Sequence, residues 1–234
     1  MSEPRRVGGR PGGRPFAAAV LALAAGCGSP EIPVPNYGPD DGSIRFRDDA
    51  EANAEVDVPI GELAFTAADG SPRTIDDLAP GRPVVLVVTR GQTDPICPVC
   101  TTQTARLIKA YPRFRELGAE VVVVYPRRAE GGEGMFEAFL EVVAQRLETK
   151  EIDVPFPIVF DPGLAVVRRL EIESELAKPT TLVLDARRRV RYAFVGETYT
   201  VRPSIETLLT QVRRVVGDGG AAEAVGGDPS EGGV

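Results

Sequence analysis

Histidine and tryptophan are absent from this chain of 234 residues, and cysteine occurs only three times. Without histidine, the sequence excludes serine–histidine and cysteine–histidine nucleophile systems and most zinc and copper sites. Positive charge is also scarce, because 27 lysines and arginines stand against 34 aspartates and glutamates and leave a net charge of -7. That negative balance lacks the excess of positive charge that nucleic-acid-binding proteins use to attract phosphates. These absences predict no nucleic-acid partner and no resident metal or cofactor.

The first segment has the pattern of a bacterial export signal. Four arginines precede an apolar run at residues 16–25, which is too short to span a bilayer as a mature helix. The run ends in Leu-Ala-Ala-Gly-Cys27, which resembles a lipobox whose cysteine is lipidated and becomes the mature N-terminus. The alternative is an ordinary secretory signal cleaved nearby, which leaves Cys27 as an odd thiol. We expect an exported protein, lipid-anchored to a membrane that faces the periplasm or the cell exterior.

Composition divides the rest of the chain into three parts. Residues 28–56 are rich in proline and acidic side chains and are expected to form an extended linker. Residues 57–216 carry the apolar patterns of one folded domain. Residues 217–234 consist mainly of glycine, alanine and acidic residues without an apolar period, and we expect a disordered tail.

The chemistry is expected at Cys97 and Cys100, which lie between a buried strand and a helix that begins near Pro98. Unpaired N–H groups and the positive end of the helix dipole stabilise a thiolate at such a place. In an exported protein the pair could also be a structural disulfide. However, a four-residue ring contributes only about 2 kcal/mol by loop entropy, so the redox-active interpretation is favoured.

Hydrophobic periodicity predicts an α/β domain with a central mixed sheet flanked by helices. Uninterrupted apolar runs indicate strands buried on both faces, and helical spacing of apolar residues separates them. A β-hairpin and a closing helix follow near the end of the domain. The expected strands are residues 83–88, 120–125, 155–160, 180–184 and 190–195, and the principal expected helices begin near residues 98, 136 and 205.

Three stretches of the expected domain carry a family resemblance. They run from Thr89 to Gln103, from Lys178 to Asp185 and from Arg202 to Ser204. Together with the order of strands and helices, they make residues 57–216 similar to the thioredoxin fold. Within that fold the chain resembles the redoxins of the alkyl hydroperoxide reductase/thiol-specific antioxidant (AhpC/TSA) family.

This resemblance implies a thiol–disulfide oxidoreductase. Cys97 would attack a disulfide and Cys100 would resolve the mixed intermediate, which leaves a Cys97–Cys100 disulfide. Pro179 would be a cis-proline packed against the cysteines, and the backbone of Lys178 would pair with the substrate. Arg90 is either the cation that lowers a cysteine pKa or a solvated loop charge. The implied partners are disulfide-bearing proteins or a thiol reductant, met at a membrane to which the lipid anchor holds the chain.

Two other functions remain open at this stage. In a peroxiredoxin-like thiol peroxidase with a peroxide substrate, Cys100 falls at the peroxidatic position, Cys97 takes the place of a threonine, and Pro179 takes the place of an arginine. Both departures favour the oxidoreductase. A copper metallochaperone on the same fold is the third interpretation, since thiolates suit Cu(I). Such proteins normally add a histidine, which this chain lacks.

Overall fold

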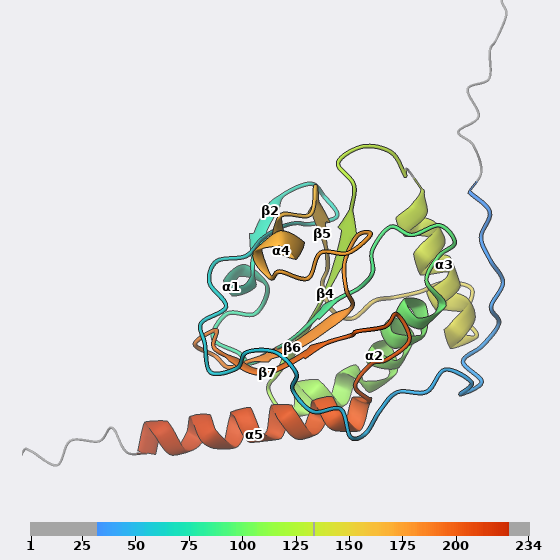
Figure 1. The fold of residues 1–234 in the computed structure, drawn as a ribbon. Coiled ribbons are helices and arrows are strands. Elements are labelled where there is room, and N and C mark those ends of the chain that lie inside the picture. Colours follow the sequence, from blue (N-terminus) through green and yellow to red (C-terminus); the bar gives the residue numbers. More distant parts are fainter. Residues whose placement is uncertain (1–31, 133, 225–234) are drawn as a thin grey trace, which may run out of the picture. The chain divides into compact units, whose positions relative to one another are not determined.

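The computed structural model describes residues 32–132 and 134–224, whose strands form a seven-stranded sheet (Figure 1). The α/β architecture with a central sheet and flanking helices is the predicted one. The strands are β1 (Ala64–Thr66), β2 (Pro72–Thr74), β3 (Val84–Val88), β4 (Glu120–Arg127), β5 (Ile158–Pro162), β6 (Thr180–Leu184) and β7 (Val190–Val195). The helices are α1 (Ile75–Leu78), α2 (Pro98–Glu116), α3 (Met135–Leu147), α4 (Ala165–Arg169) and α5 (Ile205–Ala224).

The sheet is mixed, with the order β2-β1-β5-β4-β3-β6-β7. Strands β3, β4 and β5 are parallel and are connected through α2 and α3, whereas β6 pairs antiparallel with β3. Because β3 lies between β4 and β6, both of its edges are paired and all five of its residues are buried. The end of β3 therefore gives the chain that follows it, with the two cysteines, a fixed starting point.

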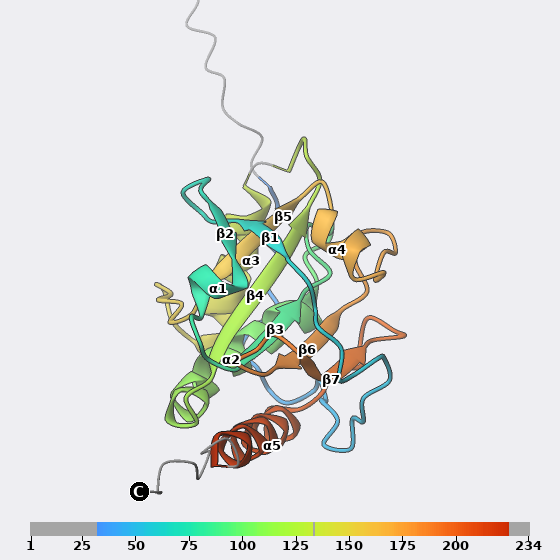
Figure 2. The same cartoon turned by 90° about the vertical axis from the view of Figure 1, so that its left-hand side faces the viewer.

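The two faces of the sheet are covered by different helices (Figures 1 and 2). Val84, Leu86 and Val88 of β3 belong to an apolar cluster with α1 and α4, whereas Val85 and Val87 belong to a cluster with α2 and α5. This alternation follows from the two-residue period of a strand, which points successive side chains to opposite faces. The β-branched run is thus apolar throughout because each face has its own helical layer.

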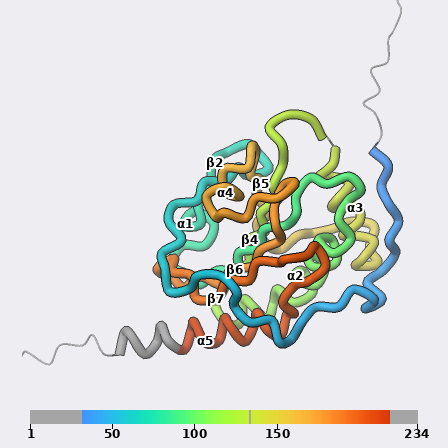
Figure 3. The backbone as a smooth tube through the Cα atoms, in the orientation of Figure 1, coloured from blue at the N-terminus to red at the C-terminus, as the bar shows by residue number. Residues whose placement is uncertain are grey.

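The segment at residues 32–56, which we call the strap, lies before the predicted start of the domain at residue 57. It was expected to be an extended linker, but it packs on the domain, whose compact unit begins at Ile32 and not near Asp57. The reason is that five of its apolar side chains rest against an apolar cluster that contains the cysteines. Figure 3 traces the strap along α3 and on toward the start of α5. The packed side chains are Ile32, Val34, Tyr37, Ile44 and Phe46.

The two ends of the chain differ in what the structure describes. Helix α5 continues past Val216, its predicted end, to Ala224, so the predicted tail is corrected for residues 217–224. The predicted export signal, with Cys27, and residues 225–234 lie outside the described residues. Within the described part, no helix is both long and apolar enough to cross a membrane.

Candidate active site

The loop that leads into the cysteines is fastened to the neighbouring strand β4. The backbone N–H groups of Thr89 and Gln92 donate to the carbonyl oxygens of Val124 (3.0 Å) and Pro126 (2.8 Å). Gly91 has a φ of +85°, and a Cβ at this position would overlap the carbonyl of Pro126. Only glycine suits both the left-handed backbone and the close approach. The loop is therefore held at the carboxyl end of β3 by backbone contacts.

Both cysteines lie at the first turn of α2. Cys97 is the N-cap, and its sulfur accepts a hydrogen bond from the backbone N–H of Cys100 (3.3 Å). Pro98 occupies the first turn, where a missing N–H leaves no hydrogen bond unmade. The thiols are free, their sulfur atoms are 2.6 Å apart, and the exposed fractions are 4% for Cys97 and 1% for Cys100. The predicted dithiol is thus brought together, with Cys97 as the slightly more exposed member.

A buried arginine, which the sequence did not single out as a site residue, lies beside this pair. Arg202, only 1% exposed, precedes α5 and directs its Nη2 to the sulfur of Cys100 (3.9 Å). Its Nε donates to Oε1 of Gln103 in α2 (3.1 Å), and its Nη1 to the carbonyl of Val201 (2.8 Å). No carboxylate of the described residues pairs with Arg202. Since buried charges require a partner, a Cys100 thiolate is the natural counter-charge.

The pKa values of the two thiols are displaced in opposite directions. Burial alone would raise the pKa of Cys100, but the Cys97 S–H, the Arg202 charge and the backbone of Arg90 lower it to about 6. The pKa of Cys97 is raised, first by its hydrogen bond to Cys100 and then by burial. The two sulfurs therefore share one proton near neutral pH and lose their protons in two separate steps. The negative charge is centred on the sulfur next to Arg202.

The strap covers the cysteine loop from one side. The Tyr37 hydroxyl donates to the carbonyl of Ile96, the residue before Cys97 (2.8 Å). Burial raises the pKa of Tyr37, and the nearby Cys97 raises it further. The backbone N–H of Arg47 donates to the carbonyl of Arg202 (2.9 Å). One segment thus supports both the loop before the cysteines and the arginine beside them.

Lys178 and Pro179 differ from their expected roles. The cis peptide bond of the described residues lies between Asp94 and Pro95, so the predicted cis-proline at Pro179 is wrong. The N–H of Lys178 donates to Ile172 (2.7 Å), and its carbonyl accepts from the Thr180 hydroxyl (3.0 Å). The backbone of Lys178 is therefore occupied by hydrogen bonds within the chain. Among the described residues, no hydrogen bond or ion pair joins Lys178 or Pro179 to the cysteines.

Of the two roles left open for Arg90, the geometry does not favour that of the cation, because the residue meets Cys100 through its backbone. Its guanidinium lies 3.5 Å from the centre of the Tyr199 ring and 3.4 Å from a carboxylate oxygen of Glu175. Its backbone lowers the pKa of Cys100, whereas the cation that does so is Arg202. No sequence spacing connects residue 202 with residue 100. The only sequence signal was the match of the Arg-Pro-Ser stretch to the family pattern, which carried no role for its arginine.

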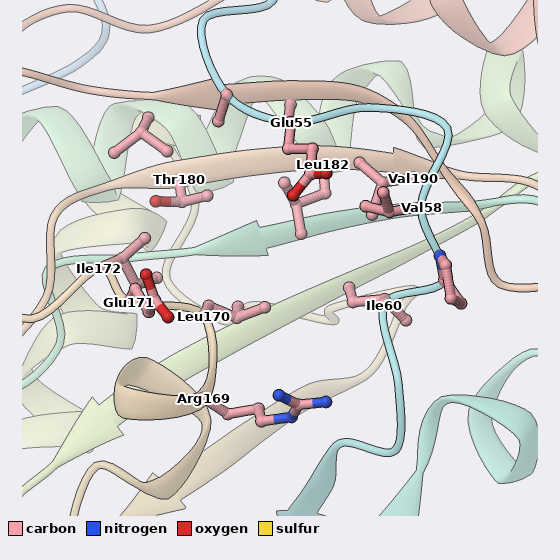
Figure 4. Close-up of a pocket in the computed structure, with 14 residues that line it drawn as sticks. Glu55, Val58, Ile60, Arg169, Leu170, Glu171, Ile172, Thr180, Leu182 and Val190 are labelled. Carbon is pink, nitrogen blue, oxygen red and sulfur yellow. The ribbon is translucent and has the colours of Figure 1, made fainter.

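A pocket of about 430 Å³ lies on the opposite face of the sheet from the cysteines. Leu182 and Val190 form part of its apolar wall, and Glu55 lies across it from Arg169 of α4 (Figure 4). These apolar residues belong to the cluster of α1 and α4, whereas the cysteines belong to a separate cluster with α3. Among the described residues, no group of three or more cysteine or acidic side chains is arranged to hold a metal ion. The cysteine pair at the start of α2 is therefore the candidate active site.

Comparison with protein-family models matches residues 56–193, more than half of the chain, to the AhpC/TSA family. No curated protein matches the chain significantly. Solved structures with the same thioredoxin-like fold include a yeast mitochondrial 1-Cys peroxiredoxin, with 17% identity and a TM-score of 0.57, covering 76% of this chain and 85% of the other.

Two further structures align over 70% of this chain and 99% of their own, each with a TM-score of 0.50. One is a putative thiol:disulfide interchange protein DsbE from Chlorobium tepidum, 19% identical. The other is the peroxidoxin BcpB from Mycobacterium tuberculosis, 17% identical. At these identities the likeness establishes the fold alone.

Proposed function

The chain belongs to the AhpC/TSA family, and from this premise we propose that it is an exported thiol–disulfide oxidoreductase that uses the Cys97–Cys100 pair. One observation carries the proposal. Two free thiols lie 2.6 Å apart beside a buried guanidinium that has no carboxylate partner among the described residues. Such a pair is built to lose a proton easily and to close into a disulfide, which is the chemistry of a dithiol couple.

The proposed reaction begins at Cys97, the more exposed sulfur. As its proton moves to the Cys100 sulfur, the Cys97 thiolate attacks one sulfur of a substrate disulfide, and the substrate's other sulfur leaves as a thiolate. The released substrate thiolate takes the proton from Cys100, and the Cys100 thiolate beside Arg202 then attacks the Cys97 sulfur of the mixed disulfide. The Cys97–Cys100 bond forms, the second substrate sulfur is released, and the substrate has gained two electrons. Proximity makes the second attack effectively intramolecular.

Trapping with single variants tests this assignment. Cys100→Ser leaves the attacking thiol without a resolving partner, so we expect a stable mixed disulfide with an oxidised model protein, detected by mass spectrometry. Cys97→Ser should trap far less, because the sulfur of Cys100 is 1% exposed. Equal trapping by both variants, or none by either under conditions in which the wild-type protein reduces the model disulfide, would contradict the roles given to Cys97 and Cys100.

A thiol peroxidase is the second candidate, favoured by the deep burial of Cys100 next to Arg202. A site of this kind excludes bulky substrates and admits a small oxidant. The Cys100 thiolate would attack a peroxide oxygen, the O–O bond would break, and the leaving oxygen would take the shared proton and depart as an alcohol or as water. Cys97 would then attack the resulting sulfenic acid, which forms the disulfide and releases water.

Stopped-flow mixing separates the two candidates. The reduced protein is mixed with hydrogen peroxide and, in parallel, with an oxidised model disulfide. Fast disulfide exchange with slow peroxide reaction supports the oxidoreductase. Rapid and saturating thiol loss with peroxide, together with a sulfenic acid trapped in Cys97→Ser, supports the peroxidase and contradicts the first proposal.

The proposal also places the protein at a membrane. The basic start, the short apolar run and the lipobox-like ending at Cys27 support lipidation of that residue and anchoring outside the cytoplasm. Its partners would then be disulfide-bearing proteins or a thiol reductant in an oxidising compartment. Expression of the full chain and of Cys27→Ser tests this point. We expect the variant to lose the lipid mass and to leave the membrane fraction, and an unlipidated wild-type protein would contradict the anchor.

A further inference from the structure

A pocket of about 470 Å³ opens beside the active site, at the carboxyl ends of β4 and β5 and the start of α3. We call it the arginine pocket. Its walls combine aromatic rings with two guanidinium groups and one amide. The residues that matter here are Gln92, Tyr125, Arg127, Arg128, Phe136 and Phe160.

Tyr125 lines this pocket and lies near the two cysteines. Its ring is 2% exposed and packs in the apolar cluster that contains Cys97 and Cys100. On the pocket side it meets Phe136 with ring centres 5.2 Å apart, and Phe136 meets Phe160 at 4.8 Å. Gln92 lines the same pocket and lies in the loop that leads to Cys97. The pocket and the cysteine pair are therefore neighbours, because Tyr125, Phe136 and Phe160 line the pocket and also pack in the cluster that holds the cysteines.

The charge in the pocket is mainly positive. Arg127 lies over the ring of Phe160, with its guanidinium carbon 4.4 Å from the ring centre. Neither Arg127 nor Arg128 has a carboxylate partner among the described residues, and Glu137 is the acidic side chain that the pocket lining includes. Several other arginines are paired with a carboxylate, such as Arg113 with Glu206. Two guanidinium groups that have no carboxylate partner among the described residues and lie beside aromatic rings suit a small anion with an apolar body.

We propose that the arginine pocket binds a small thiol that carries a carboxylate or sulfonate and delivers it to the Cys97–Cys100 disulfide. This inference rests on the function proposed above. The thiolate of the small molecule attacks Cys97, forming a mixed disulfide and releasing Cys100 as a thiolate beside Arg202. A second small thiolate then attacks the small-molecule sulfur of that mixed disulfide. Its products are a small-molecule disulfide and a reduced pair, so two thiols supply the two electrons.

The experiment compares three two-carbon thiols that differ mainly in charge. The oxidised protein is mixed with 2-mercaptoethanesulfonate (anionic), 2-mercaptoethanol (neutral) or cysteamine (cationic) at constant ionic strength. Acid quenching, alkylation and mass spectrometry follow the loss of the disulfide, and each rate is divided by the thiolate concentration. We expect a preference of about tenfold for the anionic over the neutral thiol, the lower range of electrostatic steering, and none for the cationic thiol.

Two double variants with the same change of charge locate the effect. Arg127→Gln/Arg128→Gln should reduce the ratio of anionic to neutral rates to near one. Arg213→Gln/Arg214→Gln removes an adjacent pair of exposed arginines on α5 and should preserve the wild-type ratio. Unreactive ethanesulfonate should slow the anionic thiol more than sodium chloride of equal ionic strength does, which reports binding apart from reaction.

The outcomes distinguish a failure of the pocket inference from a failure of the proposed dithiol function. If 2-mercaptoethanol reduces the Cys97–Cys100 disulfide but the anionic thiol has no advantage, the pocket inference is overturned and the dithiol function stands. The same holds if both double variants lower the ratio equally, since general surface charge would then explain it. If no Cys97–Cys100 disulfide forms or none of the thiols reduces it, the proposed function fails and the inference fails with it.

Discussion

The strap and the arginine pocket flank the same cysteine loop, and they differ in how firmly each is attached to it. On the strap side, Tyr37 bonds to the residue before Cys97, and Asp40 pairs with Arg106 of α2 at 2.7 Å. Arg146 of α3 adds a hydrogen bond to the carbonyl of Tyr37 (3.1 Å). On the pocket side, where the loop is held to β4 by backbone hydrogen bonds, the side-chain hydrogen bond is an exposed contact between the Gln92 amide and the carbonyl of Gly131 (3.2 Å).

The two sides of the cysteine loop therefore differ in the environment that they give the sulfur atoms. The strap side is packed with apolar side chains, which excludes water and strengthens the attraction between Arg202 and the Cys100 thiolate. The pocket side leaves room next to Tyr125 and presents positive charge. A closed side that favours ionisation and an open side with room for a substrate would meet two requirements of the proposed reaction.

The largest expected effect comes from the loop that both flanks share. Gly91→Ala places a methyl group against the carbonyl of Pro126 in left-handed backbone, and we expect a stability loss of about 3 kcal/mol or more in urea unfolding. Gly81→Ala is the matched control, because Gly81 also has a positive φ but open space around it. It should cost only about 1 kcal/mol. Equal losses would show that the close approach to β4 does not fix the loop.

The next effect concerns the charge behind the closed side. Arg202→Met should raise the pKa of Cys100, now about 6, by about one to three units. Iodoacetamide labelling of the reduced protein between pH 5 and 9 measures this, and the rate at pH 6.5 should fall about threefold for a shift of one unit and more for a larger shift. Arg202→Lys, which keeps the charge, should restore part of the shift. An unchanged profile in Arg202→Met would remove Arg202 from the site.

The same shift has a consequence for stability. Folding lowers the pKa of Cys100 from the ordinary 9.0 to about 6, so between these values the unfolded chain binds the proton and the folded chain does not. Stability from the thiolate is therefore fully present above pH 9 and is lost as the pH falls through 6. Unfolding of the reduced protein from pH 6 to 8 should show this rise with pH, and Arg202→Met should flatten it.

A smaller effect is expected when the strap loses its contact with the loop. Tyr37→Ala removes a ring that packs on the cysteine cluster and a hydrogen bond to Ile96, at a cost of about 2 kcal/mol. Tyr37→Phe keeps the ring and should cost about 1 kcal/mol. Site-resolved labelling should find Cys97 several-fold more reactive in the alanine variant than in the phenylalanine variant. If both variants label like the wild type, the strap does not close this side.

The smallest effect is expected on the open side. Gln92→Ala removes the exposed contact with Gly131, and we expect a stability change within about 0.5 kcal/mol. Labelling of Cys97 in the same variant should stay within twofold of the wild type. A loss as large as that of Tyr37→Ala would mean that the two flanks are held alike, and the contrast between them would be lost.

The fold was largely accessible from the sequence, since it depends on local patterns. The β-branched run of β3 and the run of β4 are apolar on both faces, which indicated central strands before any partner was known. The end of α5 was placed at Val216 because the glycine-rich sequence that follows has no apolar period and a low helix propensity. The strap was predicted to be an extended linker because its apolar side chains are spaced irregularly among prolines. No periodic pattern in the sequence indicated that they pack on the domain.

The sequence by itself determined the reactive groups, a cysteine pair at a helix start, because that chemistry lies within four consecutive residues. It also determined that no histidine takes part. Only the tertiary structure decided which cation accompanies the thiolate. Arg202 reaches Cys100 because the chain returns past α2 before α5, and Tyr125 joins the arginine pocket to the cysteines because β4 and α3 meet there. Such distances depend on how helices and strands that are far apart in the sequence pack together, and no local sequence pattern predicts that packing.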